Sequence, residues 1–251
     1  MAQGSTGKVS LVTGASRGIG AATALKLAAL GSDVVINYRS KASRAEEVAA
    51  AVEQLGRRAI AVQADLTETD EVEQMLGIVE ETFKRLDLLI LNASGGLERD
   101  KAEGYAMTLN HDAQLQLAKL SIKLMRGGGR IVFVTSHWAH FYGDQQVIPG
   151  YEVVARSKHA GEKALREYAS EMEDVGISLV VVSGDVIEGT ITPRLLERSN
   201  PGLMDARRNE TGALPTVAEF AEVIARSAFD ADIATGHTIF VGPTLLSESP
   251  Q

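Results

Sequence analysis

The sequence predicts an α/β fold of the doubly wound kind, with about seven parallel strands in one sheet and helices on both faces. Short apolar runs rich in Val, Ile and Leu recur along the chain, amphipathic stretches separate them, and a glycine-rich turn follows the first run. Apolar strands that alternate with helices indicate a parallel sheet buried on both sides. No linker, internal repeat or low-complexity tract interrupts the 251 residues. Residues 1–251 are therefore expected to form one domain.

Each element is predicted from its own pattern. The expected strands are the apolar runs at 8–14, 33–38, 58–65, 86–94, 130–136, 177–184 and 237–242. The segments 20–31 and 44–56 are amphipathic and end in Gly31 and Gly56. Glycine is favoured where a helix ends in left-handed geometry, so both segments are predicted to be helices.

Composition excludes several functional classes. The chain carries 33 acidic and 25 basic residues, a net charge of −8, which argues against nucleic-acid binding. It contains no cysteine, so disulfides, thiolate metal sites and thiol catalysis are excluded. His137 and His140 are three residues apart but lack further ligands at metal-binding spacing, so no metal site is expected.

Nothing in the hydropathy pattern predicts a membrane protein. The opening residues MAQGSTGK contain no apolar core, so we expect no signal peptide. No apolar run approaches the roughly 20 residues needed to span a bilayer. With 45% hydrophobic residues, the chain is expected to be a soluble, cytoplasmic protein.

A glycine-rich turn marks the expected nucleotide site. Gly14, Gly18 and Gly20 follow the first strand and open the first helix. Such glycines let the backbone approach a pyrophosphate, and the helix N-terminus supplies free N–H groups, as in Rossmann folds. The Gly-x-x-x-Gly-x-Gly spacing in TGASRGIG resembles the short-chain dehydrogenase/reductase family.

The resemblance covers nearly the whole chain. ADL at 64–66, LNASGG at 91–96, TLN ending at Asn110, RIVFVTS ending at Ser136, ARSK ending at Lys158 and TGHTIFVG near the C-terminus are similar to the family's motifs. The cofactor-binding residues that the resemblance implies are Gly14, Ser16, Arg17, Gly18, Ile19, Gly20, Arg39, Asp65, Leu66, Asn92, Ala93, Ser94, Lys158, Gly184 and Thr190. Thr192 is an alternative to Thr190.

NADP(H) is the expected cofactor, and NAD(H) is the less favoured one. An acidic residue after the second strand would bind the ribose 2′-hydroxyl and repel a 2′-phosphate. Here no carboxylate follows until Glu46, and Arg39 stands where a guanidinium can pair with a 2′-phosphate. Arg17 in the glycine turn corresponds to a second base of NADP-preferring members.

The family's catalytic serine, lysine and asparagine correspond to Ser136, Lys158 and Asn110, but its tyrosine position holds Val154. Tyr151 is the first candidate for the missing proton donor. It lies seven residues before Lys158, either two helical turns away or on a loop outside the helix. The other candidates are Tyr142, His137, His140, Asp185 and a bound water.

The leading functional hypothesis is an NADPH-dependent carbonyl reductase, or alcohol dehydrogenase in reverse, with an altered proton donor and a small-molecule substrate. The alternative is a dinucleotide-binding protein with little or no turnover that acts as a sensor or partner subunit. A third hypothesis is a cofactor-assisted dehydratase or epimerase. The resemblance also implies a helical substrate lid at 190–212 and a homo-oligomer, tetramer or dimer, formed through the helices that carry Asn110 and Lys158.

Overall fold

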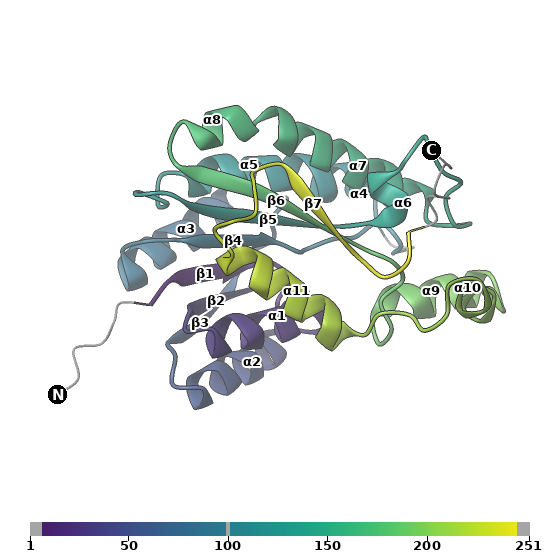
Figure 1. Ribbon diagram of the computed structural model, residues 1–251. Coiled ribbons are helices and arrows are strands. Elements are labelled where there is room, and N and C mark those ends of the chain that lie inside the picture. The colour runs from purple at the N-terminus through teal and green to yellow at the C-terminus, as the bar shows by residue number, and fades with distance from the viewer. Residues whose placement is uncertain (1–6, 99–100, 245–251) are drawn as a thin grey trace.

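The computed structural model describes residues 7–98 and 101–244, and their seven strands form one parallel sheet in the order β3-β2-β1-β4-β5-β6-β7 (Figure 1). The strands are β1 (Val9–Val12), β2 (Asp33–Tyr38), β3 (Ala59–Gln63), β4 (Leu88–Leu91), β5 (Gly129–Ser136), β6 (Ile177–Gly184) and β7 (His237–Val241). Every neighbouring pair is parallel. The predicted fold class is confirmed.

Helices cover both faces of the sheet (Figure 1). One face packs against α1 (Gly18–Ala29), α2 (Ala42–Gln54) and α11 (Val217–Phe229). The other packs against α3 (Thr69–Phe83), α5 (Ala113–Ser121), α7 (Glu152–Glu167) and α8 (Ala169–Glu173). The remaining helical segments are α4 (Tyr105–Met107), the π-helical turn η1 (Thr108–Asp112), α6 (His137–His140), α9 (Ile191–Ser199) and α10 (Leu203–Thr211).

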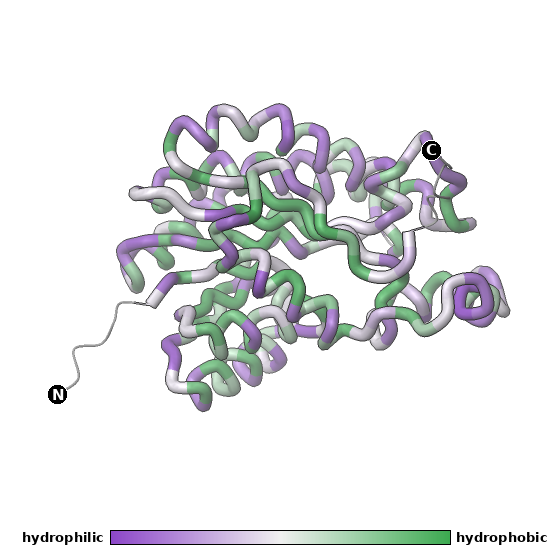
Figure 2. Tube along the Cα trace, in the orientation of Figure 1, coloured by the Kyte–Doolittle hydropathy of each residue, from purple (hydrophilic) through white to green (hydrophobic). Residues whose placement is uncertain are grey.

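Alternate residues of each strand belong to opposite faces. Leu11 packs in the core on the α5 side, whereas its neighbour Val12 packs in the core on the α1 side. Both side chains are fully buried, as a parallel sheet between two helical layers requires. Figure 2 shows the apolar strands through the middle of the molecule and polar residues on the outer helices.

The first and fourth strands are shorter than predicted, most of all at their carboxyl ends. The first covers Val9–Val12 rather than 8–14, and the fourth covers Leu88–Leu91 rather than 86–94. In both cases the chain leaves the sheet to form a loop, with Gly14 at φ 62° in the first. The predicted glycine helix ends are confirmed, because Gly31 and Gly56 have φ of 95° and 77° after α1 and α2.

A third apolar cluster lies over the carboxyl ends of β5 and β6. It combines the segment between β5 and α7 with residues 190–212, which form α9 and α10. Its buried members are Trp138, Ala139, Val147, Ile148, Tyr151, Val154, Ala155, Val186, Leu196, Met204 and Leu214.

Two predictions concern residues that lie partly outside the described ranges. One is the expectation for the N-terminal segment MAQGSTGK, whose first six residues lie outside them, and the other is the single domain of residues 1–251, whose two ends do. Within the described ranges, none of the helices combines the length and the apolar character required to cross a membrane.

Candidate active site

The glycine turn forms a cradle at the carboxyl end of β1. Gly14 and Gly18 have φ of 62° and 56°, which favours glycine. A side chain at Gly20 would come within 2.7 Å of the Asn92 amide nitrogen and the Gly14 carbonyl oxygen, so helix α1 can pack this closely only with glycine there. No described side chain caps the N-terminus of α1. Its N–H groups are thus left for an anionic ligand, which fits a dinucleotide pyrophosphate.

Other predicted cofactor residues surround this cradle. Ser16 lies in the turn and Ile19 in the first turn of α1, and both are partly exposed, whereas Arg17 is exposed. The Asn92 amide donates to the Thr13 carbonyl at 2.8 Å, and the N–H of Ala93 donates to the Thr13 hydroxyl at 2.9 Å. The loop after β4 is therefore fixed against the end of β1.

The predicted adenine turn lies at the end of β3. One oxygen of Asp65 accepts hydrogen bonds from the N–H and hydroxyl of Thr67, at 3.1 and 2.8 Å. The neighbouring Leu66 is buried, whereas Ser94, in the loop after β4, is exposed. Asp65 is thus held by its own turn with one carboxylate oxygen left over.

Arg39 follows β2 and is exposed, as a 2′-phosphate ligand must be. Its guanidinium donates a hydrogen bond to the Tyr105 hydroxyl and lies over the Tyr105 ring, 5.8 Å from the centroid. Lys101 lies 4.8 Å from the centroid of the same ring. Two cations therefore converge on one aromatic ring beside the predicted 2′-phosphate position. The sequence analysis missed Tyr105 because no motif marks it.

Ser136 is the last residue of β5 and is nearly buried, with 8% of its surface exposed. Its hydroxyl oxygen accepts a hydrogen bond from the Ala139 N–H at 3.3 Å and another from the Tyr151 hydroxyl at 3.3 Å. A serine hydroxyl that accepts twice keeps its own proton for donation. Ser136 can therefore donate to a substrate oxygen.

Tyr151 lies directly before α7, which begins at Glu152. Its N–H donates to the Ile148 carbonyl, and its own carbonyl accepts from the Ala155 N–H at 2.9 Å. The side chain is outside the regular helix and reaches back to Ser136, which matches the loop alternative of the sequence analysis. Burial raises the pKa of Tyr151, and the hydrogen bond with Ser136 offsets part of that rise. The hydroxyl thus keeps its proton at neutral pH.

Val154 takes no part in this contact. It is 3% exposed and packs in the apolar cluster that includes Trp138 and Tyr151. A side chain on Gly96 would lie 3.2 Å from Val154, so the valine faces the loop after β4.

Lys158 lies in the middle of α7 and is 7% exposed. Burial lowers its pKa from 10.5 to about 8, and the carboxylate of Glu162 one turn later opposes that shift. Among the described residues, the Lys158 ammonium has no hydrogen-bond partner. A buried ammonium without such bonds is costly, which fits a group that a bound ribose would satisfy.

Asn110 lies in the π-helical turn η1 and is 1% exposed. Its amide group donates to the Gly95 carbonyl at 2.8 Å and to the Ser157 hydroxyl at 2.9 Å, and its oxygen accepts from the Gly95 N–H at 3.2 Å. The side chain joins the loop after β4 to helix α7 beside Lys158. Its geometry is that of a positioning residue.

Three of the other proton-donor candidates have different partners. His137 Nδ1 is 2.9 Å from the Ser183 hydroxyl, and burial lowers the histidine pKa. The Tyr142 ring lies against His159, with centroids 5.8 Å apart. Asp185 is fully buried at its side chain and pairs with Arg207. No hydrogen bond in the described residues joins any of the three to Ser136.

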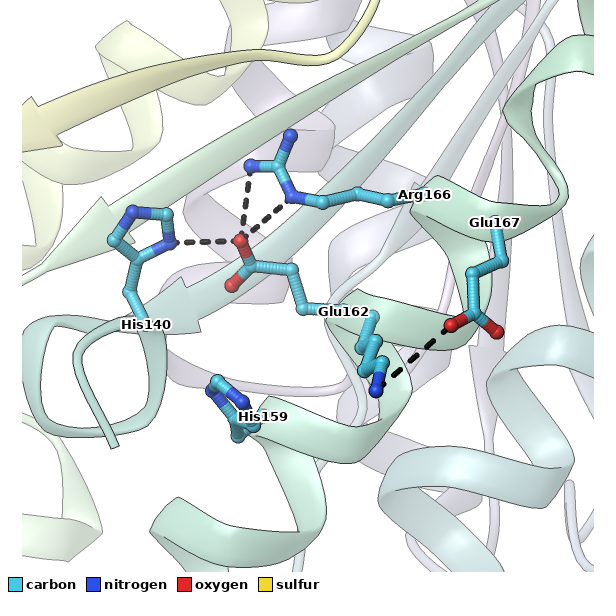
Figure 3. A pocket seen from close by; sticks show the side chains of 6 residues that line it. His140, His159, Glu162, Arg166 and Glu167 are labelled. Carbon is cyan, nitrogen blue, oxygen red and sulfur yellow. Dashed lines mark hydrogen bonds and ion pairs between the residues drawn. The ribbon is translucent and has the colours of Figure 1, made fainter. Parts of the chain in front are cut away.

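His140 lines a separate groove of about 480 Å³ along α7 (Figure 3). Its Nδ1 is 2.7 Å from a Glu162 oxygen that also accepts from Arg166. The histidine and the arginine both lower the pKa of Glu162, against the effect of burial. This side-chain arrangement directs His140 to Glu162 rather than to Ser136.

The predicted nicotinamide end lies where β6 stops. Gly184 ends the strand, and a side chain there would come within 2.8 Å of the Phe220 ring. Thr190 precedes α9, and its hydroxyl donates to the Ile187 carbonyl at 2.9 Å. Within the described ranges, no group of three or more His, Asp and Glu side chains is arranged to hold a metal ion.

Comparisons with known proteins agree with this geometry. The profile of the short chain dehydrogenase family matches residues 8–199. The chain is 34% identical to a 1-cyclohexenylcarbonyl-CoA reductase of Streptomyces collinus, over 97% of this chain and 88% of that protein. It superposes with a TM-score of 0.81 on a short chain dehydrogenase from Burkholderia cenocepacia in complex with NADP, at 31% identity and with 94% and 96% coverage of the two chains. An angucycline C-6 ketoreductase with bound NADP gives a TM-score of 0.79, at 30% identity and 96% coverage of both chains.

Together, the family match and these neighbours support an oxidoreductase that acts on a carbonyl or alcohol group with a nicotinamide dinucleotide.

Proposed function

Because this chain belongs to the short-chain dehydrogenase family, we propose that it reduces a carbonyl group with NADPH and that Tyr151 supplies the proton. The observation that carries this proposal is the hydrogen bond from the Tyr151 hydroxyl to Ser136 Oγ. It brings a tyrosine to the serine although the residue four before Lys158 is Val154.

Ser136 and Tyr151 have different roles in the proposed reaction. A bound NADPH supplies the hydride that the carbonyl carbon accepts. Ser136 donates a hydrogen bond to the carbonyl oxygen, since in the described part of the chain its hydroxyl only accepts. Tyr151 transfers its proton to the same oxygen as negative charge develops there, which yields the alcohol and a tyrosinate. Such proton transfer contributes about 10²–10⁴-fold to a rate.

The raised pKa of Tyr151 favours the reductive direction. A phenol that stays protonated at neutral pH is a ready acid, whereas alcohol oxidation needs it ionised first. Lys158 would bind the nicotinamide ribose, which gives its buried ammonium the partners it lacks among residues 7–98 and 101–244. Arg39 and Arg17 would bind the 2′-phosphate, which is the basis for NADPH over NADH.

The substrate is proposed to be a small molecule with an apolar body. The wall beside Ser136 and Tyr151 is the apolar cluster of the β5–α7 segment and the lid. The angucycline ketoreductase neighbour supports a ketone as the reacting group. The α9–α10 segment would form the lid, and the homo-oligomer and the cytoplasmic location stay proposals drawn from the family.

A binding protein without turnover is the second candidate, because Val154 occupies the position of the family tyrosine. The two are separated by following NADPH oxidation with α-tetralone, cyclohexanone and ethyl acetoacetate while NADPH binding is measured by its fluorescence. The reductase proposal predicts turnover that Ser136→Ala abolishes with NADPH binding retained. Tight NADPH binding with no turnover of any of the three would favour the binding protein.

A further inference from the structure

A buried ion pair joins the lid to the end of the sheet. Asp185 directly follows β6. Arg207 in α10 donates from Nε and Nη2 to the two oxygens of this carboxylate, at 3.1 and 2.9 Å. The exposed fractions of the two side chains are 5% and 0%. Nη1 of the same arginine donates to Glu210 at 2.9 Å. A buried pair of charges is costly to break from one side, because the remaining charge is left without a partner.

The same guanidinium also touches the catalytic end of β5. It lies over the ring of Trp138, 5.2 Å from the centroid, where a cation is attracted to the face of an indole. Trp138 in turn packs edge-on against Tyr151, with ring centroids 5.9 Å apart and an interplanar angle of 71°. Tyr151 donates to Ser136. Contacts therefore run without a break from Asp185 through Arg207 and Trp138 to the proposed proton donor.

Tyr151 depends on such support more than a tyrosine inside α7 would. The residue precedes the helix, so the i, i+3 and i, i+4 neighbours that fix a helical side chain are present on its carboxyl side alone. Tyr151 is 7% exposed and is held by the apolar cluster, in which Trp138 and the α10 residue Met204 take part. The direction of the hydroxyl is therefore set by packing from the lid side.

We propose that Arg207 is a positioning residue for carbonyl reduction: its pairing with Asp185 holds α10 in place and keeps Trp138 against Tyr151, so that the tyrosine hydroxyl stays directed at Ser136. This inference rests on the proposed role of Tyr151. It adds that the lid acts on the proton donor through the indole ring, in addition to covering the substrate.

Arg208 provides the matched control. It neighbours Arg207 on α10 and also makes two ion pairs, with Glu188 and Asp205, each at 2.9 Å. Those pairs lie at the surface, where ion pairs contribute little. Arg207→Met and Arg208→Met therefore each remove a guanidinium from α10. The guanidinium of Arg207 belongs to the series of contacts that reaches Tyr151, and that of Arg208 does not.

The first test compares these variants in the NADPH-dependent reduction of α-tetralone at saturating NADPH. Displacement of a reacting group lowers kcat, so Arg207→Met should lose about tenfold or more in kcat with KM changed by less than about threefold. Arg208→Met should stay within about twofold of the wild type, and Arg207→Lys should recover part of the loss. A raised KM with unchanged kcat in Arg207→Met would overturn the proposal, because it would describe a lid that affects substrate binding alone.

Trp138 provides a readout that needs no substrate, because it is the only tryptophan of the chain. In the free protein, Arg207→Met should shift the tryptophan emission to longer wavelength as water reaches the indole, and Arg208→Met should not. An unchanged emission spectrum in Arg207→Met would overturn the proposal even if Tyr151 is the proton donor. Conversely, if Tyr151→Phe kept full activity while Arg207→Met still shifted the emission, the assignment of Tyr151 as the proton donor would be wrong.

The double variant Asp185→Asn/Arg207→Met separates positioning from instability. Removing both charges leaves no unpaired carboxylate, so the melting temperature should recover relative to Arg207→Met alone. The proposal predicts that kcat stays at least about tenfold low in the double variant, because the contact with Trp138 is still missing. Recovery of kcat together with stability would overturn it, since the defect would then come from the orphaned Asp185.

Discussion

The hydroxyl of Tyr151 donates to Ser136 Oγ at 3.3 Å across 15 residues of sequence. The tyrosine reaches the serine from the residue directly before α7, outside the regular helix. Val154, four residues before Lys158, packs in the apolar cluster. The chain therefore places side by side a serine from the end of β5 and a tyrosine from the start of α7.

Arg39 is predicted to select NADPH over NADH. Arg39→Ala should weaken NADPH binding at least about tenfold, since a charge-assisted pair with a phosphate is lost, and should leave NADH binding little changed. The measurement is a titration of cofactor fluorescence with both nucleotides. Arg126→Ala is the control, because Arg126 is an exposed arginine paired with Glu80 and lies just before β5, at the opposite end of the strands. Equal losses for NADPH and NADH would refute the 2′-phosphate assignment.

Lys158 is predicted to destabilise the free protein in a pH-dependent way. Its pKa is 10.5 in the unfolded chain and about 8 in the folded one, so the unfolded chain binds more protons between these pH values. The burial penalty is therefore complete below pH 8 and is relieved as pH rises from 8 towards 10.5. A difference of this size corresponds to roughly 3 kcal/mol.

The check is urea unfolding of Lys158→Met, which keeps a long side chain without the charge. Without cofactor at pH 7, the variant should have a free energy of unfolding about 2–3 kcal/mol above that of the wild type. The gap should narrow by pH 9.5. A variant that is less stable than the wild type at pH 7, or a gap that does not change with pH, would contradict the account.

Asn110 is predicted to be needed for stability as well as for activity. Asn110→Ala leaves both backbone groups of Gly95 and the Ser157 hydroxyl without their partner. Unsatisfied buried groups of this kind should lower the free energy of unfolding by about 2–3 kcal/mol. Asn200→Ala, which removes an amide at the end of α9 that donates to the Pro149 carbonyl, should cost under about 1 kcal/mol. Thermal melting of both variants compares the two losses of stability. Equally small losses would contradict the prediction, since the Asn110 hydrogen bonds would then contribute little to stability.

The fold was predictable because it depends on pattern. Apolar runs of Val, Ile and Leu recur along the chain with helical stretches between them, and a glycine turn follows the first run, as a parallel sheet between helices requires. All seven predicted strands occur in the structure. The carboxyl ends of β1 and β4 were less predictable. Thr13 and Asn92 read as strand residues in the sequence, but they hydrogen-bond to each other across the loops that form the site.

The candidate site was predictable wherever a residue keeps its place in a motif, as Ser136 and Lys158 do. The direction of the Tyr151 side chain was not, because it depends on where α7 begins and on the packing of Trp138. Arg207 had no sequence signal: in the string DARRNE it looks like one of two solvated arginines. Only the fold separates it from Arg208, by burying one against Asp185 and leaving the other at the surface.

The most direct test of the central claim is the turnover of Tyr151→Phe with α-tetralone and NADPH, beside Tyr142→Phe as the control. Tyr142 lies in the same segment but packs against His159. If Tyr151 donates the proton, Tyr151→Phe should lose at least about tenfold in kcat while NADPH binding and the Tyr142→Phe rate stay near wild type. Equal turnover of wild type and Tyr151→Phe would contradict the account.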